Sequence, residues 1–105
     1  MNIQSSESVW LNGNAVCRID HLIEVSGLSI EEVEDLIENE LIAPTDQTTQ
    51  PRSFALHYVL TVKTARRLRD DFQLDRHALV LALTLLQRIS ALENDLNAMQ
   101  AKLGR

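Results

Sequence analysis

An apolar repeat near the C-terminus constrains the fold more than any other feature of this sequence. Apolar residues recur there at alternating spacings of three and four for about three heptads, which is the a/d pattern of a coiled coil. These positions are Ala82, Leu85, Ile89, Leu92, Leu96, Met99 and Leu103. Asp75 is a suitable N-cap for a helix that would run from Arg76 to about Lys102 and measure roughly 40 Å.

A helix of this length exceeds what the rest of a 105-residue chain can cover. Its apolar stripe therefore needs another surface, most simply the same stripe of a second copy. We expect a homodimer with these a/d positions in its interface; the alternative is a helix that folds back on its own core. The pattern does not decide whether the paired helices run parallel or antiparallel.

The residues upstream of this helix predict a helix-turn-helix. A short helix over Ile19–Val25 would end at Ser26-Gly27, where glycine can adopt the left-handed conformation. The segment Ser29–Glu32 is a capping box that would open a second helix extending to Leu41. Its inward stripe is expected to contain Ile30, Val33, Ile37 and Leu41, with Leu36 beside it.

Short strands are predicted around these helices. Asn12-Gly13, between two apolar runs, is a strong hairpin signal. Leu41–Ala43 and Arg52–Ala55 flank a polar stretch and are expected to pair as a two-stranded wing. A third helix over Leu56–Phe72 would bury Val59, Val62, Ala65, Leu68 and Phe72. We therefore expect a mainly α fold: a winged helix-turn-helix over residues 1–75, joined as one compact unit to a dimerisation helix over residues 76–105.

Residue types that support catalysis or cofactor binding are sparse. The three glycines are isolated, and no histidine has a paired nucleophile at a recognised spacing. Cys17 and His21 could face one metal ion, but a structural site needs about four ligands. We expect no catalytic, cofactor-binding or metal-binding residues. A single cysteine, no secretory pattern in Met1–Leu11 and no apolar run long enough for a membrane span together predict a cytoplasmic protein.

Charge is divided unevenly along the chain. Residues 1–50 contain ten acids and one base, a net charge of −9, whereas residues 51–105 contain nine bases and five acids, a net charge of +4. The predicted second helix carries six carboxylates and neither lysine nor arginine. In a DNA-binding helix-turn-helix this helix enters the major groove, where phosphates demand cations. DNA is therefore disfavoured, which leaves a cationic protein partner or a solvated face without a ligand.

Four of these acids are spaced to line one exposed helix face: Glu31, Glu34, Asp35 and Glu38. Exposed ion pairs contribute about 0.2–1 kcal/mol each, and micromolar affinity needs about 8 kcal/mol. We therefore expect an apolar anchor beside the acids and select Leu36, with Ile42 as another candidate by position.

A basic patch is expected on the third helix, at Lys63, Arg66, Arg67 and Arg69. Its role stays open between nucleic-acid binding and pairing with the acidic half or with Asp70 and Asp71.

The run Arg67–Asp75, followed by the Ala-Leu-Thr-Leu-Leu segment Ala82–Leu86, resembles the chaperone modulator CbpM family. That family is a divergent, MerR-like winged-helix group, and the resemblance extends from about Val16 to the end of the chain. It implies binding to the J-domain of a CbpA-type, DnaJ-like co-chaperone, with inhibition of its stimulation of DnaK and of its DNA binding. Two alternatives remain: a MerR-family transcriptional regulator that binds DNA as a dimer, and a coiled-coil adaptor that uses its C-terminal helix.

Overall fold

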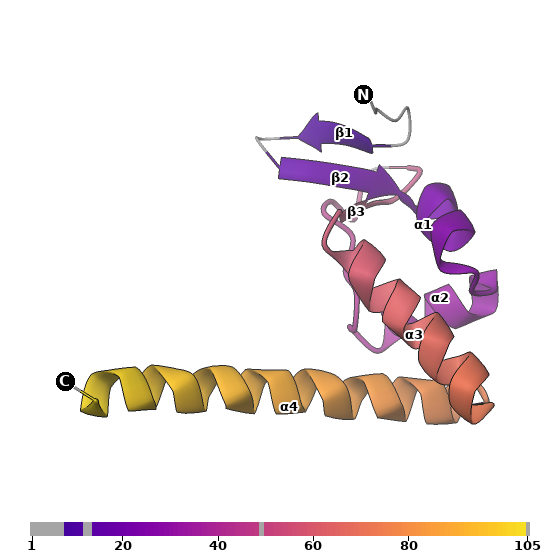
Figure 1. The fold of residues 1–105 in the computed structure, drawn as a ribbon. Helices are drawn as coiled ribbons and strands as arrows, with labels where there is room; N and C mark the ends of the chain where they lie inside the picture. The colour runs from indigo at the N-terminus through magenta and orange to yellow at the C-terminus, as the bar shows by residue number, and fades with distance from the viewer. Residues whose placement is uncertain (1–7, 12–13, 49, 105) are drawn as a thin grey trace.

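The computed structural model describes residues 8–11, 14–48 and 50–104. Figure 1 shows a small sheet, the shorter helices beneath it and a long helix that extends away from them. In chain order the elements are β1 (Ser8–Leu11), β2 (Asn14–Arg18), α1 (Ile19–Ser26), α2 (Ile30–Glu38), β3 (Ser53–Ala55), α3 (Tyr58–Phe72) and α4 (Arg76–Leu103). The mainly helical fold class with a helix-turn-helix and a long C-terminal helix is confirmed.

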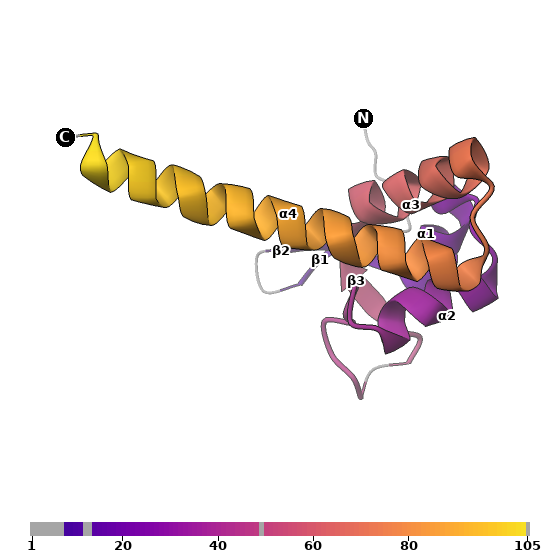
Figure 2. The same ribbon diagram turned by 90° about the horizontal axis from the view of Figure 1, so that it is seen from below.

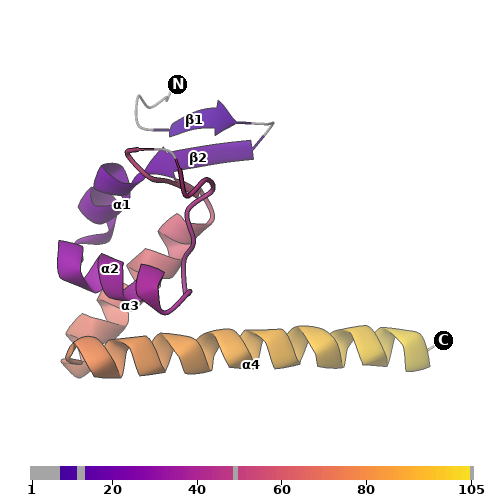
Figure 3. The same cartoon turned by 180° about the vertical axis from the view of Figure 1, so that it is seen from behind.

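The sheet is antiparallel, with strand order β1-β2-β3. Val9 pairs with Val16 across the predicted hairpin, whose Asn12-Gly13 turn lies outside the described residues. On the other side of β2, Cys17 pairs with Phe54 of β3. Seen from behind, the sheet and α4 lie on opposite sides of α1, α2 and α3 (Figure 3).

The predicted wing is present as a narrow antiparallel pairing, but its first strand, over Leu41–Ala43, is wrong. Residues 41–43 form no strand. The chain meets β3 just after them, at an isolated bridge between Pro44 and Phe54 and through the Thr45 amide, which donates to the Ser53 carbonyl at 2.8 Å. The backbone amides of Leu41 and Ile42 donate to the Leu36 carbonyl instead, and both side chains are buried. Leu41 and Ile42 therefore close the end of α2 and fill the core. The strand partner of β3 is β2 instead.

The helix-turn-helix begins and ends its helices largely where the capping residues of the sequence predict. Gly27 ends α1 with a φ of 77°, in the left-handed region. Ser29 and Glu32 form both hydrogen bonds of the capping box, since the Ser29 amide donates to Glu32 Oε1 at 2.8 Å and the Glu32 amide to Ser29 Oγ at 3.1 Å. Helix α2 ends at Glu38, before the predicted Leu41, because Asn39 caps it and Glu40 turns the chain with a φ of 62°.

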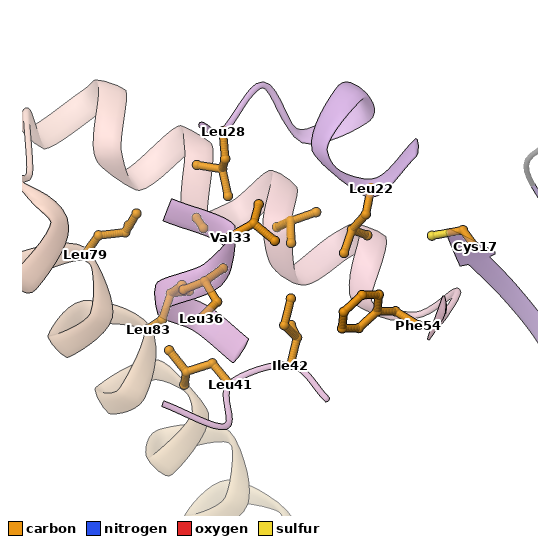
Figure 4. Close-up of a cluster of buried hydrophobic side chains, with 12 residues drawn as sticks. Cys17, Leu22, Leu28, Val33, Leu36, Leu41, Ile42, Phe54, Leu79 and Leu83 are labelled. Atoms are coloured by element: carbon orange, nitrogen blue, oxygen red, sulfur yellow. The ribbon is translucent and has the colours of Figure 1, made fainter. Parts of the chain in front are cut away.

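One core joins the sheet, α1, α2, α3 and the first turns of α4. Figure 4 shows the labelled side chains of this core, with Leu79 and Leu83 of α4 reaching toward Leu36 and Leu41. Ile30 and Phe72 were predicted to be buried, but they are 55% and 68% exposed. Each stands at a terminus of its helix, and at the end of α3 it is Leu74, not Phe72, that packs against the core.

Helix α4 begins at the predicted cap, where Asp75 Oδ1 accepts from the Ala78 amide at 2.9 Å. Its first turns are buried against the helix-turn-helix through Leu79 and Leu83, and Gln87 Nε2 donates to the Leu41 carbonyl at 3.2 Å. The remainder extends beyond the other elements (Figure 2). Among the described residues, no helix is both long enough and apolar enough to cross a membrane.

Candidate partner-binding surface

Helix α2 lies between the segment leading to β3, the end of α3 and the start of α4. Three of its carboxylates each bind an arginine from one of these neighbours, with closest N–O distances of 2.6 Å. The pairs are Glu32–Arg69, Glu34–Arg52 and Asp35–Arg76. The basic half of the sequence therefore neutralises part of the acidic helix within the molecule.

The pair between Glu34 and Arg52 joins α2 to the residues before β3. Arg52 donates through both terminal nitrogens, at 3.2 Å to Glu34 Oε1 and 2.6 Å to Oε2. This parallel geometry is the strong form of an arginine–carboxylate contact. The hydrogen bond from Arg52 holds the pKa of the Glu34 carboxyl below its ordinary value.

The pair between Asp35 and Arg76 joins α2 to the first residue of α4. Arg76 Nε donates to Asp35 Oδ2 at 2.6 Å, and Nη2 donates to Oδ1 at 2.9 Å. The hydrogen bond lowers the pKa of the Asp35 carboxyl and raises that of the guanidinium. Together with the hydrogen bond from Gln87 to the Leu41 carbonyl, it joins α4 to α2 and to the residues that follow α2.

The basic patch on α3 divides into paired and free cations. Arg69 donates to Glu32 at 2.6 Å and to Asp70 at 3.0 Å, and Arg66 donates to Asp70 at 2.8 Å. Pairing with the acidic half is therefore confirmed for Arg69, and pairing with Asp70 is confirmed for both arginines. Lys63 and Arg67 are exposed, and neither forms an ion pair within the part of the chain that the structure describes.

The predicted acidic face is only partly free. Glu31 and Glu38 are exposed and form no ion pair with the described residues, whereas Glu34 and Asp35 are half-buried and held by arginines. The prediction of Leu36 as a surface anchor is wrong, because its side chain is 0% exposed and points into the core (Figure 4). Ile42 is equally buried. Five of the nine residues of α2 are charged, and its inward positions, Val33 and Leu36, are taken up by the core.

A groove of about 660 Å³ lies between α2 and the start of α4. Its lining includes Leu74 and Val80, which are half-buried, and Glu38, which is exposed. Another groove, of about 430 Å³, lies between the end of α2 and the segment before β3, with Arg52 in its lining. The first groove was not found from the sequence, because it forms only when α4 docks beside α2.

The family model described as MerR HTH family regulatory protein matches residues 17–101. The chain belongs to this family. It is also similar to the chaperone modulatory protein CbpM of Pseudomonas putida F1, at 27% identity over 80% of this chain and 83% of that protein. The CbpM protein of Pseudomonas entomophila L48 is 25% identical over the same shares. The resemblance to the chaperone modulator family is confirmed, and these relatives are named as regulators rather than enzymes.

Within the MerR HTH fold, α2 occupies the position of the helix that enters the major groove in DNA-binding relatives of the helix-turn-helix. Here its outward side presents Glu31 and Glu38, and the helix contains no lysine or arginine. The loop before β3 adds Asp46, which is exposed. This surface would face DNA phosphates with like charge.

The predicted dimer positions of this family member lie along α4. From Leu85 onward they are exposed, up to 82% at Leu103, whereas Ala82 is half-buried. Leu81 and Leu86 are exposed as well and flank the a/d positions. The a/d count missed them because they occupy the neighbouring g and e positions, where an apolar residue widens the stripe.

Cys17 and His21 were weighed above as metal ligands. Cys17 is fully buried beside Phe54, and burial raises the pKa of its thiol. No group of three or more possible ligands (His, Cys, Asp or Glu) comes together among the described residues.

Proposed function

We propose that this chain is a cytoplasmic, non-catalytic chaperone modulator that binds the J-domain of a CbpA-type, DnaJ-like co-chaperone. Binding would inhibit both the stimulation of DnaK and the DNA binding of that co-chaperone. The observation that carries the proposal is the acidic α2 of a MerR-family fold whose relatives are named chaperone modulatory proteins.

The chemistry of the surface supports a cationic protein partner. J-domains present a basic helix to their chaperone, and the free carboxylates of Glu31 and Glu38 stand on an exposed helix that could compete for it. Charges of this kind mainly steer the encounter and exclude wrong partners. Apolar contacts have to supply most of the affinity, because exposed ion pairs give only about 0.2–1 kcal/mol each.

The direct test uses a purified J-domain and the unmodified chain in calorimetry, followed by a DnaK ATPase assay. We expect saturable binding that weakens as salt is raised, and loss of the ATPase stimulation that the co-chaperone provides. A J-domain that neither binds at tens of micromolar nor loses its stimulation would overturn the proposal.

We further propose that the chain acts as a homodimer joined through α4. The apolar stripe from Leu85 to Leu103 has no cover from the described residues of its own domain, and a second copy offers a matching surface. A coiled-coil adaptor would instead bind its partner through this stripe. Truncation after Ile89 distinguishes the homodimer from the adaptor, because an adaptor would then lose partner binding altogether.

A second candidate is a MerR-type transcriptional regulator, favoured by the family match and by the intact helix-turn-helix. The carboxylates on α2 oppose it. An electrophoretic shift at low salt, or selection from genomic DNA that enriches one palindromic site, would support this function and count against the modulator.

A further inference from the structure

The groove between α2 and α4 supplies the apolar contact that the acidic surface lacks. Leu36 and Ile42 are buried and cannot meet a partner. Leu74 and Val80 are half-buried and line the groove, so part of each side chain is open to it. Helices α2 and α4 are in contact, and Figure 2 shows α2 beside the first turns of α4.

The charges around this groove favour a cation. Four carboxylates line it, at Glu32, Asp35, Glu38 and Asp75, against the single guanidinium of Arg76. Two of them already bind arginines, and Asp75 serves as the cap of α4. Glu38 is exposed and makes no ion pair with any described residue, which leaves its carboxylate available to a ligand.

The other grooves fit such a ligand less well. The groove before β3 shares Glu38 with the groove between α2 and α4, but it is smaller and its lining includes the guanidinium of Arg52. The hollow between α1 and α3 is lined by three cations, Lys63, Arg66 and Arg67, against two carboxylates, Asp70 and Asp71, so its net charge does not favour a cation.

Resting on the proposed function, we infer that the groove between α2 and α4 receives one turn of a basic amphipathic helix from the J-domain. An apolar side chain of that helix lies against Leu74 and Val80, and a lysine or arginine one turn away binds Glu38. A single helical face can present both, because residues three or four apart share a side. This is the helix-in-groove mode of recognition, with the charge fixing direction and the apolar residue supplying affinity.

The test is calorimetric titration of a purified J-domain into the full chain and matched variants. Glu38→Lys reverses the charge at the groove. Glu31→Lys makes the same change on the same helix outside it, and Glu40→Lys makes it at the neighbouring groove. We expect Glu38→Lys to weaken binding about tenfold and each control about twofold or less.

A second arm blocks the groove without touching the core. His77 is exposed and lines the groove, so His77→Trp would place an indole in it while thermal unfolding stays unchanged. We expect about a tenfold loss of affinity. Amide signals of residues 74–80 should also shift when the unmodified chain binds.

The outcomes separate this inference from the proposed function. If the three charge variants lose affinity equally and His77→Trp binds normally, the inference that the J-domain helix binds in this groove is wrong. J-domain binding itself would still stand. An unmodified chain that does not bind the J-domain would overturn both.

Discussion

The ion pair between Glu34 and Arg52 allows a quantitative test of how α2 is held. The two hydrogen bonds are parallel, and the side chains are 45% and 27% exposed, so solvent screens the pair only in part. Fully exposed pairs contribute about 0.2–1 kcal/mol, and bidentate geometry favours the upper end of that range. We therefore expect a coupling free energy of about 1 kcal/mol between the two side chains.

A double-mutant cycle measures this coupling. Glu34→Gln, Arg52→Gln and the double variant are compared with the unmodified chain by urea unfolding, at one protomer concentration because a dimer gains stability with concentration. The matched control is the pair Arg66–Asp70 on the surface of α3, whose partners are both exposed. Its coupling should be clearly smaller.

The same pair predicts a pH dependence. Because Arg52 lowers the folded-state pKa of Glu34, the charged carboxylate stabilises the fold at any pH above the unfolded pKa of about 4.3. That contribution is lost as the pH falls through the lower, folded-state pKa. Coupling at pH 7 no larger than in the control pair, or coupling that persists at pH 2, would refute the reasoning.

Three further outcomes follow from the fold. Ile89→Asp with Leu96→Asp should give a monomer by light scattering at tens of micromolar, where the unmodified chain should be a dimer; a monomeric unmodified chain contradicts the α4 interface. Gln73→Gly should raise the free energy of unfolding by about 0.5–1 kcal/mol, measured by urea unfolding, because Gln73 has a φ of 53°. Ile42→Ala should lower the free energy of unfolding by about 2–5 kcal/mol, whereas Ile30→Ala should change it little, since only Ile42 is buried. Similar losses for the two variants would contradict this difference in burial.

The features predicted well from the sequence are those that depend on neighbours in the chain. The left-handed Gly27, the box formed by Ser29 and Glu32, and the cap at Asp75 each involve residues a few positions apart. Such contacts form wherever the helix forms, whatever packs against it. The boundaries of α4 were predictable for the same reason.

Tertiary contacts decided what the sequence left uncertain. Periodicity predicts which face of a helix points inward, but it does not show how far along the helix the core extends. Ile30 and Phe72 were therefore predicted to be buried, although the core does not reach them. Leu41 and Ile42 have the composition of a strand, yet both side chains are buried in the core and both backbone amides donate to the Leu36 carbonyl. A wing strand at these positions would have removed them from the core.

The acidic face was the least predictable part of the site, because composition gives the sum of charges and not their pairing. Reversing Glu34, Asp35 and Glu38 together would break two internal ion pairs as well as alter the surface, so a loss of binding could come from either cause. Glu31 and Glu38 are free of this ambiguity, since neither forms an ion pair among the described residues. Glu38 also lines the groove, whereas Glu31 does not. A comparison of these two single reversals can therefore distinguish general attraction of a cation from contact at a defined place.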